Sequence, residues 1–422
     1  MALGIHGMKV STSIFLTLIA VPAYILLVVA AEWNFAPQQH VQVKSEALNG
    51  VAKLGEFLFN DVNLSEPKGQ ACVSCHDPAR QRQGNNGSPI VSVAPGSRAH
   101  VFGNRNVPSS MYAYDVPQFA FAPYTGEDGT VSYVARGGLF WDGRADDLAG
   151  QASGPLLNPL EMNNKSLEAV ISKVKKSEYA GLARKLYGDV IFDDPKSATE
   201  KFMAAIAEYE RIGEFSPFAS KFDSYLRGTI SFTPKETKGF ELFKDPTKGN
   251  CLSCHVGNEK SRRSEDWLFT DFGYSALGLP RNPAIPANRN PSHFDLGLCM
   301  QPAIAKKLPA GFDVKSLCGA FKVPTLRNVA VTGPYFHNGA ITTLRDAVKF
   351  YVTRDTDPAL WYPSDPKGKI QKFNDLPEQY HGNVSLRKIP YDRMPGEPPR
   401  LNDEEIDAIV AFLETLTDPA GK

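Results

Sequence analysis

The sequence of 422 residues has no excess of either charge, because Lys+Arg and Asp+Glu both number 46. A protein that binds nucleic-acid phosphates usually carries a basic excess, so this balance argues against that class. Cysteine is also scarce, with six residues in the whole chain. So few cysteines do not suit a disulfide-built scaffold, and their spacing therefore carries more information than their number.

The sequence also lacks persuasive runs of alternating apolar and polar residues, the pattern of half-buried strands. Apolar residues instead recur at three- and four-residue steps in segments 48–58 and 402–416, and 166–225 also has a helical pattern. Two Pro-rich stretches, 279–311 and 355–400, follow neither period and predict ordered loops. The expected fold is therefore mainly α.

The long apolar run in the chain extends from Ile14 to Ala31 and ends in small residues before Glu32. Small residues at that place suit cleavage by a signal peptidase. The run has 18 residues, at the short end for a membrane span of about 20. We expect residues 1–31 to be a signal peptide, with an uncleaved N-terminal anchor as the alternative. In both cases the folded part lies outside the cytoplasm, and after cleavage no membrane contact is expected.

Two parts of the chain repeat one another. The first reads Gly-Glu-Phe-Leu-Phe at 55–59 and Cys-Val-Ser-Cys-His at 72–76; the second reads Gly-Phe-Glu-Leu-Phe at 239–243 and Cys-Leu-Ser-Cys-His at 251–255. Each copy places a short amphipathic helix before a Cys-x-x-Cys-His motif. The repeat predicts two similar domains, 45–228 and 229–422, with one site each.

Cys-x-x-Cys-His is the attachment signature of c-type haem. The expected attachment residues are Cys72, Cys75, Cys251 and Cys254, and the expected proximal iron ligands are His76 and His255. A zinc site and a thioredoxin-like redox pair are the alternatives. Paired zinc knuckles usually lie about 15–20 residues apart, whereas these motifs are 179 residues apart. A redox pair does not require a histidine after the second cysteine. The sequence therefore predicts two covalent haems.

Cys299 and Cys318 belong to neither motif and lie in a loop that contains proline. In an oxidising compartment we expect them to form a disulfide that closes this loop. Two free buried thiols are the alternative.

Four further segments carry a family resemblance. They read Phe-Trp-Asp-Gly-Arg at 140–144, Pro-Leu-Glu-Met at 159–162, Phe-Lys-Val-Pro-Thr-Leu-Arg-Asn at 321–328 and Thr-Gly-Pro-Tyr-Phe-His-Asn-Gly at 332–339. Together with the two haem motifs, they make the chain resemble the bacterial dihaem cytochrome c peroxidase/MauG family from about Leu54 to Leu416. The resemblance implies that peroxide reacts at the N-terminal haem and that the C-terminal haem stores or relays an electron.

The resemblance also implies roles for residues near the first haem. Trp141 matches the tryptophan between the two haems, and Gln151 and Glu161 match the two distal-pocket positions. Cleavage of bound peroxide needs a group that moves a proton from the near oxygen to the leaving one. Glu161 can do this, and Gln151 can orient peroxide or water by hydrogen bonds.

The distal position of the second haem separates the branches of the family. The peroxidase branch uses a methionine there, which raises the reduction potential, whereas MauG-like members use a tyrosinate. The matching residue here is Tyr351, and Met394 on a late loop is the fallback. A phenolate donor favours the higher oxidation states of iron, so the match to Tyr351 suggests the MauG-like branch.

Three other positions bear on the resemblance. MauG has a tryptophan two residues before its second haem motif, but Gly249 stands here, so the same electron route is not implied. His100 lies near the place of the distal histidine of the peroxidase branch, although a loop histidine without iron contact is an equal alternative. The resemblance also implies a calcium ion bound by Asn106, Thr332 and Pro334, and hard oxygen donors suit calcium.

These observations lead to three functional hypotheses. In the first, a periplasmic enzyme reduces hydrogen peroxide with electrons from a small electron-donor protein. In the second, a MauG-like enzyme oxidises aromatic residues of a partner protein, which Tyr351 favours and Gly249 weakens. In the third, the protein is a non-enzymatic dihaem electron carrier, which a distal pocket with Gln151 and Glu161 argues against.

Overall fold

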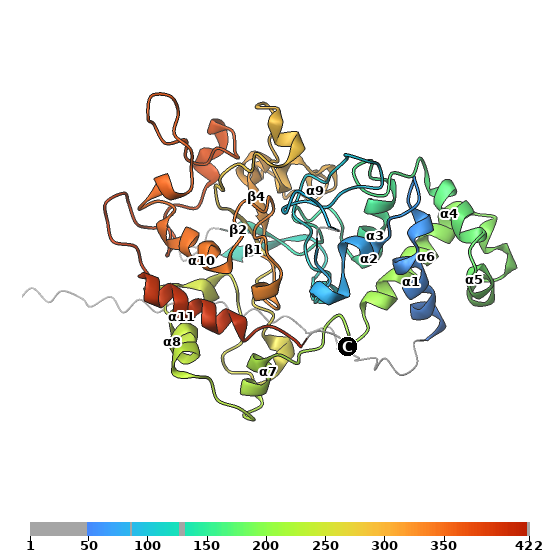
Figure 1. Cartoon of the computed structure of the whole chain (residues 1–422), viewed down its shortest axis with the longest axis horizontal. Helices are drawn as coiled ribbons and strands as arrows, with labels where there is room; N and C mark the ends of the chain where they lie inside the picture. The colour runs from blue at the N-terminus through green and yellow to red at the C-terminus, as the bar shows by residue number, and fades with distance from the viewer. Residues whose placement is uncertain (1–48, 85–86, 126–130, 420–422) are drawn as a thin grey trace, which may run out of the picture. The chain divides into compact units, whose positions relative to one another are not determined.

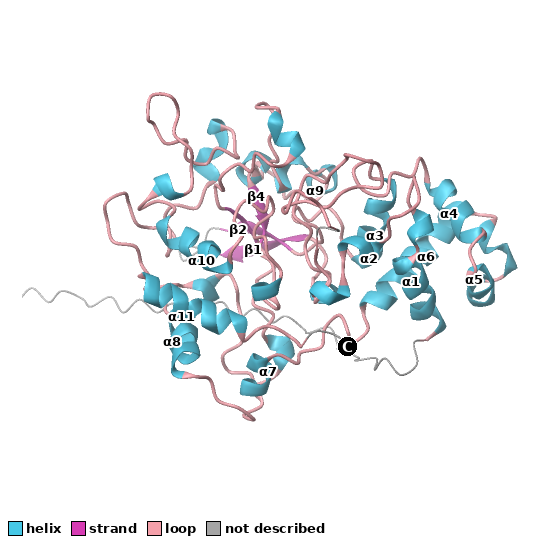
Figure 2. Ribbon diagram, viewed as in Figure 1, coloured by secondary structure: helices cyan, strands magenta, loops and turns pink. Residues whose placement is uncertain are grey.

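A computed structural model describes residues 49–84, 87–125 and 131–419 of the chain (Figures 1 and 2). The expected signal segment 1–31 lies outside the described residues. Among those that are described, no helix combines the length and the apolar character needed to cross a membrane. All of them belong to one unit, Val41–Lys422. The boundary at 228/229 stays a prediction.

Helices are the main regular structure, which confirms the expected mainly α class. The first half holds α1 (Gly50–Asn60), α2 (Cys72–Cys75), α3 (Leu148–Leu157), α4 (Leu167–Lys175), α5 (Ala180–Tyr187), α6 (Pro195–Glu210) and α7 (Lys221–Leu226). The second half holds α8 (Pro234–Lys244), α9 (Pro302–Ala305), α10 (Leu344–Thr353) and α11 (Asp403–Glu414). Short 3₁₀ turns lie between them. The segment 166–225 is helical as predicted, but it is divided into four helices.

Two small antiparallel sheets correct the expectation that strands are lacking. One pairs β1 (Ala120–Thr125) with β2 (Val131–Arg136), and the other pairs β3 (Tyr274–Ala276) with β4 (Ala320–Lys322). Most side chains of β1 and β2 are exposed or half-buried on both faces. The hairpin therefore has no buried face that would impose an alternating pattern on the sequence. Three-residue strands are too short to show one.

The repeated glycines explain why the two halves share a motif. Gly55 of α1 lies against the backbone of α6, where a Cβ atom would come within 1.9 Å of Ala205 O. Gly239 of α8 lies against α11 in the same way, since a Cβ atom there would come within 1.9 Å of Ala408 O. Because only glycine permits so close an approach, each half crosses its first helix tightly over a later one. Figure 1 shows the two pairs, α1 with α6 and α8 with α11.

The buried apolar residues form two main clusters that follow these helix pairs. The first cluster spans residues 54–215 and combines side chains of α1, α3, α4, α5 and α6. The second spans residues 222–416 and is rich in aromatic rings, among them Phe222, Phe243, Phe269 and Phe412. Helix α11 closes the second cluster and begins at a capping box of Asn402 and Glu405, an Asn-x-x-Glu pattern that is visible in the sequence and typical of a helix start.

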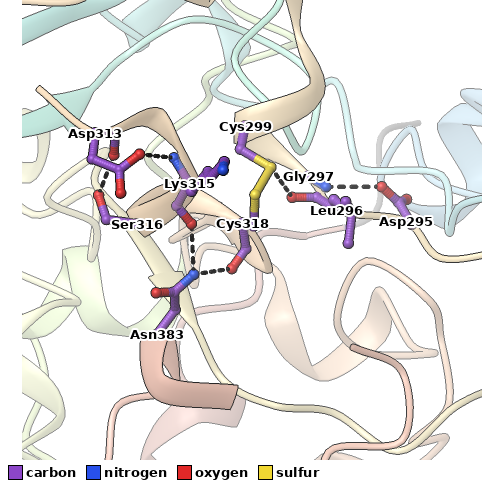
Figure 3. Close-up of a disulfide and its surroundings, with 9 residues drawn as sticks. All are labelled: Asp295, Leu296, Gly297, Cys299, Asp313, Lys315, Ser316, Cys318 and Asn383. Carbon is purple, nitrogen blue, oxygen red and sulfur yellow. Dashed lines mark hydrogen bonds between the residues drawn. A yellow bond between two sulfur atoms is a disulfide. The ribbon is translucent and has the colours of Figure 1, made fainter. Parts of the chain in front are cut away.

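The Pro-rich stretches 279–311 and 355–400 contain short helical turns but little other regular structure, in agreement with the sequence. Cys299 and Cys318 form the predicted disulfide (Figure 3). Beside it, the Asn383 side chain donates hydrogen bonds to the carbonyl oxygens of Lys315 and Cys318, at 2.8 and 3.0 Å. The disulfide and Asn383 thus hold the first Pro-rich stretch to the second.

Candidate functional site

The first Cys-x-x-Cys-His motif forms one helical turn, α2. The amide of His76 donates to the carbonyl oxygen of Cys72 over 2.9 Å, which places the histidine directly after the turn. Cys72 and Cys75 carry free thiols. Burial raises the pKa of each of these two thiols to about 12. Both are therefore protonated at neutral pH, and neither is a thiolate poised for disulfide exchange.

The ring of His76 has the geometry of an iron ligand. Its Nδ1 atom lies 3.1 Å from the carbonyl oxygen of Arg82. Burial lowers the pKa of His76, so the ring is neutral. A neutral imidazole that donates from Nδ1 presents its lone pair at Nε2, which is the arrangement that orients a histidine toward a metal.

The second motif repeats this arrangement. The amide of His255 donates to Cys251 O over 2.9 Å, and His255 Nδ1 lies 3.0 Å from Phe269 O. Burial lowers the pKa of His255 and raises that of Cys251 to about 12. Both accepting carbonyls come from non-glycine residues in the left-handed conformation, Arg82 with φ of 53° and Phe269 with φ of 54°.

These residues fit a c-type haem better than the alternatives. Each motif supplies two free thiols and one neutral histidine with a fixed tautomer. Within the described ranges, no group of three or more His, Cys, Asp or Glu side chains could hold a metal ion. The two cysteine pairs therefore do not share a zinc-type ligand set.

Glu161 lies in the turn that follows α3 and acts electrostatically on the thiols of Cys75 and Cys72. The side-chain amide of Asn158 donates a hydrogen bond to Glu161 Oε1 over 2.6 Å. Burial raises the pKa of Glu161, although the guanidinium of Arg144 opposes the shift. The sequence-predicted acid–base residue thus lies at the first motif, with a raised pKa. Gln151 is half-buried in α3.

Trp141 lies in a loop that is fixed on several sides. Its indole nitrogen donates to Asn106 O over 2.8 Å, and its carbonyl oxygen accepts from the amide of Lys322 over 2.9 Å. The next residue, Asp142, is 1% exposed and pairs with Arg105 at 2.6 Å and with Arg144 at 2.8 Å. The position of the Trp141 side chain is therefore strongly determined by its loop.

Two of the three expected calcium ligands lie together. The side-chain nitrogen of Asn106 is 2.6 Å from Pro334 O and 3.1 Å from Phe336 O. Because the two ends of an amide are assigned only from hydrogen bonding, the side-chain oxygen of Asn106 can face the same carbonyls when it is rotated. Thr332 is half-buried two residues before Pro334. These oxygen atoms suit a hard cation.

Tyr351 faces the second motif from α10. Burial raises its pKa, and the thiols of Cys254 and Cys251 act on it electrostatically. Its ring lies 5.7 Å from that of Tyr391, which is half-buried at this site. The fallback ligand, Met394, is 65% exposed, which speaks against a role as a buried ligand.

The structure also shows the surroundings of His100 and Gly249, the two other positions that bear on the family resemblance. His100 is exposed and left-handed, with φ of 61°. At Gly249 a Cβ atom would lie 2.7 Å from Leu242 O and 3.2 Å from Cys251 Sγ. A tryptophan cannot replace this glycine unless the backbone shifts.

Several residues at these sites have no signal in the sequence analysis. The carbonyls of Arg82 and Phe269 act through the backbone, so their residue types reveal nothing. Tyr391 lies in a Pro-rich loop without periodicity. Arg144 stands inside a recognised motif and Arg105 does not, and the partner that they share, Asp142, becomes evident only in three dimensions.

Two Cys-x-x-Cys-His turns, each next to a tightly crossed helix pair, are the arrangement expected of a c-type cytochrome with two haem sites. The profile of the di-haem cytochrome c peroxidase family matches residues 49–231. The methylamine utilization protein MauG of Paracoccus denitrificans is 39% identical over 380 residues, covering 88% of this chain and 89% of that protein. The cytochrome c551 peroxidase of Nitrosomonas europaea is 27% identical over 385 residues, covering 90% and 84%.

A solved structure supports the same family relationship. The crystal structure of the diheme peroxidase BthA from Burkholderia thailandensis is 42% identical in sequence, with a TM-score of 0.80 and coverage of 87% of this chain and 86% of that one. The chain belongs to the dihaem cytochrome c peroxidase/MauG family. Membership makes it an oxidoreductase of a family with two c-type haems.

Proposed function

We propose that the protein is an exported enzyme that reduces hydrogen peroxide with electrons from a donor protein. Cys72 and Cys75 would hold the first haem, and Cys251 and Cys254 the second. The observation that carries the proposal is the half-buried carboxyl of Glu161, which acts on the thiols of the first motif. An acid–base group at that place suits peroxide chemistry, whereas a pure electron carrier does not need one.

Reduction of one hydrogen peroxide molecule to two water molecules takes two electrons and two protons. Haems bound at the two motifs would supply the redox chemistry. The protein supplies proton transfer and orientation. Glu161 takes the proton from the near peroxide oxygen and returns it to the leaving oxygen. Asn158 holds one carboxylate oxygen of Glu161 in place, and Gln151 orients peroxide or water by hydrogen bonds.

In this proposal the two haem sites are coupled by Trp141 and differ in their distal ligands. The bond to Asn106 O fixes the Trp141 ring and the bond from Lys322 N fixes its backbone, which suits a side chain that carries electrons between the sites. Tyr351 is proposed to bind the second iron as a phenolate. Its location at the Cys251 and Cys254 thiols supports this role.

The remaining parts of the proposal concern organisation. Residues 45–228 would form the peroxidatic domain and 229–422 the electron-transfer domain, in the periplasm after removal of 1–31. Asn106, Thr332 and Pro334 would bind calcium. If they do, chelation should disturb the haem spectra and lower activity reversibly, since Asn106 also accepts from the Trp141 indole through its carbonyl. If chelation changes neither, these residues are structural.

A second candidate function is the oxidation of aromatic residues of a partner protein. Tyr351 and the similarity to MauG favour it. Gly249 weakens it, because the crowded backbone there excludes the tryptophan that MauG has. A non-enzymatic electron carrier is the third candidate. It predicts that neither a donor protein nor an aromatic substrate makes the protein consume peroxide.

The test begins with intact mass. The mature protein should exceed its polypeptide by two haem masses, and Cys72→Ala and Cys251→Ala should each remove one attachment. A colourless, zinc-loaded product would refute the proposal. Peroxide consumption is then measured with a reduced small cytochrome as donor. Consumption supports the peroxidase reading, and its absence together with oxidation of a protein substrate supports the MauG-like reading.

A further inference from the structure

The turn that presents the Arg82 carbonyl to His76 is strained. Gln81 and Arg82 both adopt the left-handed conformation, with φ of 51° and 53°. Two successive non-glycine residues in this region cost free energy and persist only where the surroundings hold them. Ser109 Oγ donates to Gln81 O over 2.6 Å. The Gln81 side chain donates to the carbonyl oxygen of Asp418 over 3.0 Å.

Asp418 lies near the C-terminal end of the chain and is 2% exposed. Its carboxylate accepts hydrogen bonds from the Tyr112 hydroxyl at 2.6 Å, the Ala219 amide at 2.9 Å and the Asn328 side chain at 3.1 Å. Its own amide donates to Asn328 Oδ1 over 2.7 Å. Together with the bond from Gln81, every one of these contacts joins segments far apart in the sequence. In Figure 1 the segment that follows α11 runs beside the segment that links α6 to α7, where Ala219 contacts Asp418.

Asn328 connects Asp418 to the second site, because it belongs to a segment that contacts the backbone near Phe269. It follows Arg327, whose guanidinium is fully buried and donates to Trp267 O at 2.9 Å and to Ser264 O at 3.0 Å. The hydroxyl of Thr325 donates to Leu268 O over 2.6 Å. Segment 325–328 therefore holds the backbone directly before Phe269, the residue whose carbonyl lies at His255 Nδ1.

We propose that Asp418 is a positioning residue that ties together the two carbonyl-presenting turns at Arg82 and Phe269, and thereby sets the orientation of both proximal histidines. The inference rests on the proposed function, in which His76 and His255 bind haem iron. It gives the two sites a connection on their proximal sides that is separate from Trp141. A hydrogen bond from Nδ1 makes an imidazole a stronger electron donor to its metal. Loosening either turn should therefore move the reduction potential of that haem in the positive direction.

The experiment uses the holoprotein and two changes of graded severity. Asp418→Ala removes the three side-chain bonds, and a chain that ends at Leu416 also removes the backbone bonds to Gln81 and Asn328. Hydrogen–deuterium exchange should accelerate in peptides that cover 77–84 and 267–272, by roughly tenfold or more for hydrogen bonds to a charged group. Both midpoint potentials should rise, and the truncation should have the larger effect.

A matched pair of tyrosine variants separates positioning from general stability. Tyr112→Phe and Tyr179→Phe each remove one phenol–carboxylate hydrogen bond of 2.6 Å, the first to Asp418 and the second to Asp61. Tyr112→Phe also removes the bond that the hydroxyl accepts from the Phe218 amide at 3.2 Å. Both should lower the midpoint of thermal unfolding, but only Tyr112→Phe should change the potentials and the exchange of the two peptides. Asp418→Asn, which keeps one acceptor oxygen, should be milder than Asp418→Ala.

Unchanged potentials and exchange in Asp418→Ala would overturn the proposal, as would equal changes in Tyr112→Phe and Tyr179→Phe. If Asp418→Ala does not fold, the tyrosine pair decides. Haem content, measured by mass and absorbance on the unchanged protein, tests the proposed function separately. A protein without haem would refute that function, whereas the exchange data would still report whether Asp418 holds the two turns.

Discussion

The two Cys-x-x-Cys-His sites share their proximal side and differ on the other. In both, a glycine permits a tight helix crossing, and a left-handed residue aims its carbonyl at the histidine Nδ1. Beyond these features the sites diverge. The first is faced by the carboxyl of Glu161, and the second by the phenols of Tyr351 and Tyr391.

This difference shows where the chemistry of each half is decided. The repeated segments build the part of each site that would hold a haem. The side chains that face each site from the opposite side, Glu161 at the first and Tyr351 and Tyr391 at the second, lie outside the repeat. An arginine lies at each site, but the two arginines act on different groups. The Arg354 guanidinium lies 4.7 Å from the Tyr391 ring at the second site, whereas Arg144 acts on Glu161 at the first.

The sharpest way to break the comparison is to remove the acid–base group from the first site. Glu161→Gln should keep both haems attached and slow the reaction with peroxide by roughly 10²–10⁴-fold, the range for a positioned general acid–base group. Stopped-flow absorbance measures the rate. Glu56→Gln is the control, because Glu56 is a helix carboxylate that pairs with Lys53 on the surface. An unchanged rate in Glu161→Gln would remove this residue from the mechanism.

The shared helix crossing can be tested in both halves at once. Gly55→Ala and Gly239→Ala each force a Cβ atom against a backbone carbonyl. Overpacking of this kind costs about 1–3 kcal/mol, so each variant should unfold at lower denaturant concentration. Gly181→Ala in α5 is the control, since nothing lies within 4 Å of its Cβ position. That variant should instead gain up to about 1 kcal/mol from helix propensity. Destabilisation of only one half would show that the crossings are not equivalent.

Tyr351 tests the distal difference at the second site. If its phenolate binds the second iron, that haem should lack a methionine–iron charge-transfer band and should have a low reduction potential. The fully ferric protein should then react with peroxide without prior reduction. Tyr351→His should change this ligation and abolish that reaction while both haems stay attached.

Tyr362→Phe is the control for Tyr351. Tyr362 is a buried phenol of the same half, but its hydroxyl donates to Gly278 O at 2.5 Å. Its loss should lower stability and leave the spectrum unchanged. A wild-type ferric protein that ignores peroxide until it is half-reduced would reject the MauG-like assignment and favour a cytochrome c peroxidase.

The helices and the Cys-x-x-Cys-His turns could be predicted from the sequence because both depend on local patterns. The capping box at Asn402 and the glycines of the repeat are of this kind, whereas the Cys299–Cys318 disulfide was predicted because neither motif uses these two cysteines. The β1–β2 hairpin could not be predicted, because its largely exposed faces impose no alternating pattern of apolar residues. Contacts through backbone carbonyls, such as those of Arg82 and Asp418, could not be predicted either, since any residue type supplies a carbonyl.

The smallest expected effect concerns Arg144, which joins the Trp141 loop to the first site. Glu161 must be deprotonated to accept a proton, so the peroxide rate should fall as pH falls through its pKa, which burial raises above the ordinary value. The positive charge of Arg144 opposes that rise. Arg144→Met should therefore raise the pKa further and move the acid limb of the pH–rate profile to higher pH. The Arg144 side chain is 33% exposed, and solvent screening should keep the movement below about one pH unit.

Arg98→Met provides the matched control for this shift. Arg98 donates to Pro159 O in the loop that carries Glu161, at 2.8 Å, but the electrostatic influence on Glu161 comes from Arg144. The control should therefore leave the acid limb in place. An acid limb that moves to lower pH in Arg144→Met would mean that the limb reports a different group. Equal movement in both variants would mean that the loop position, and not the charge of Arg144, sets the protonation of Glu161.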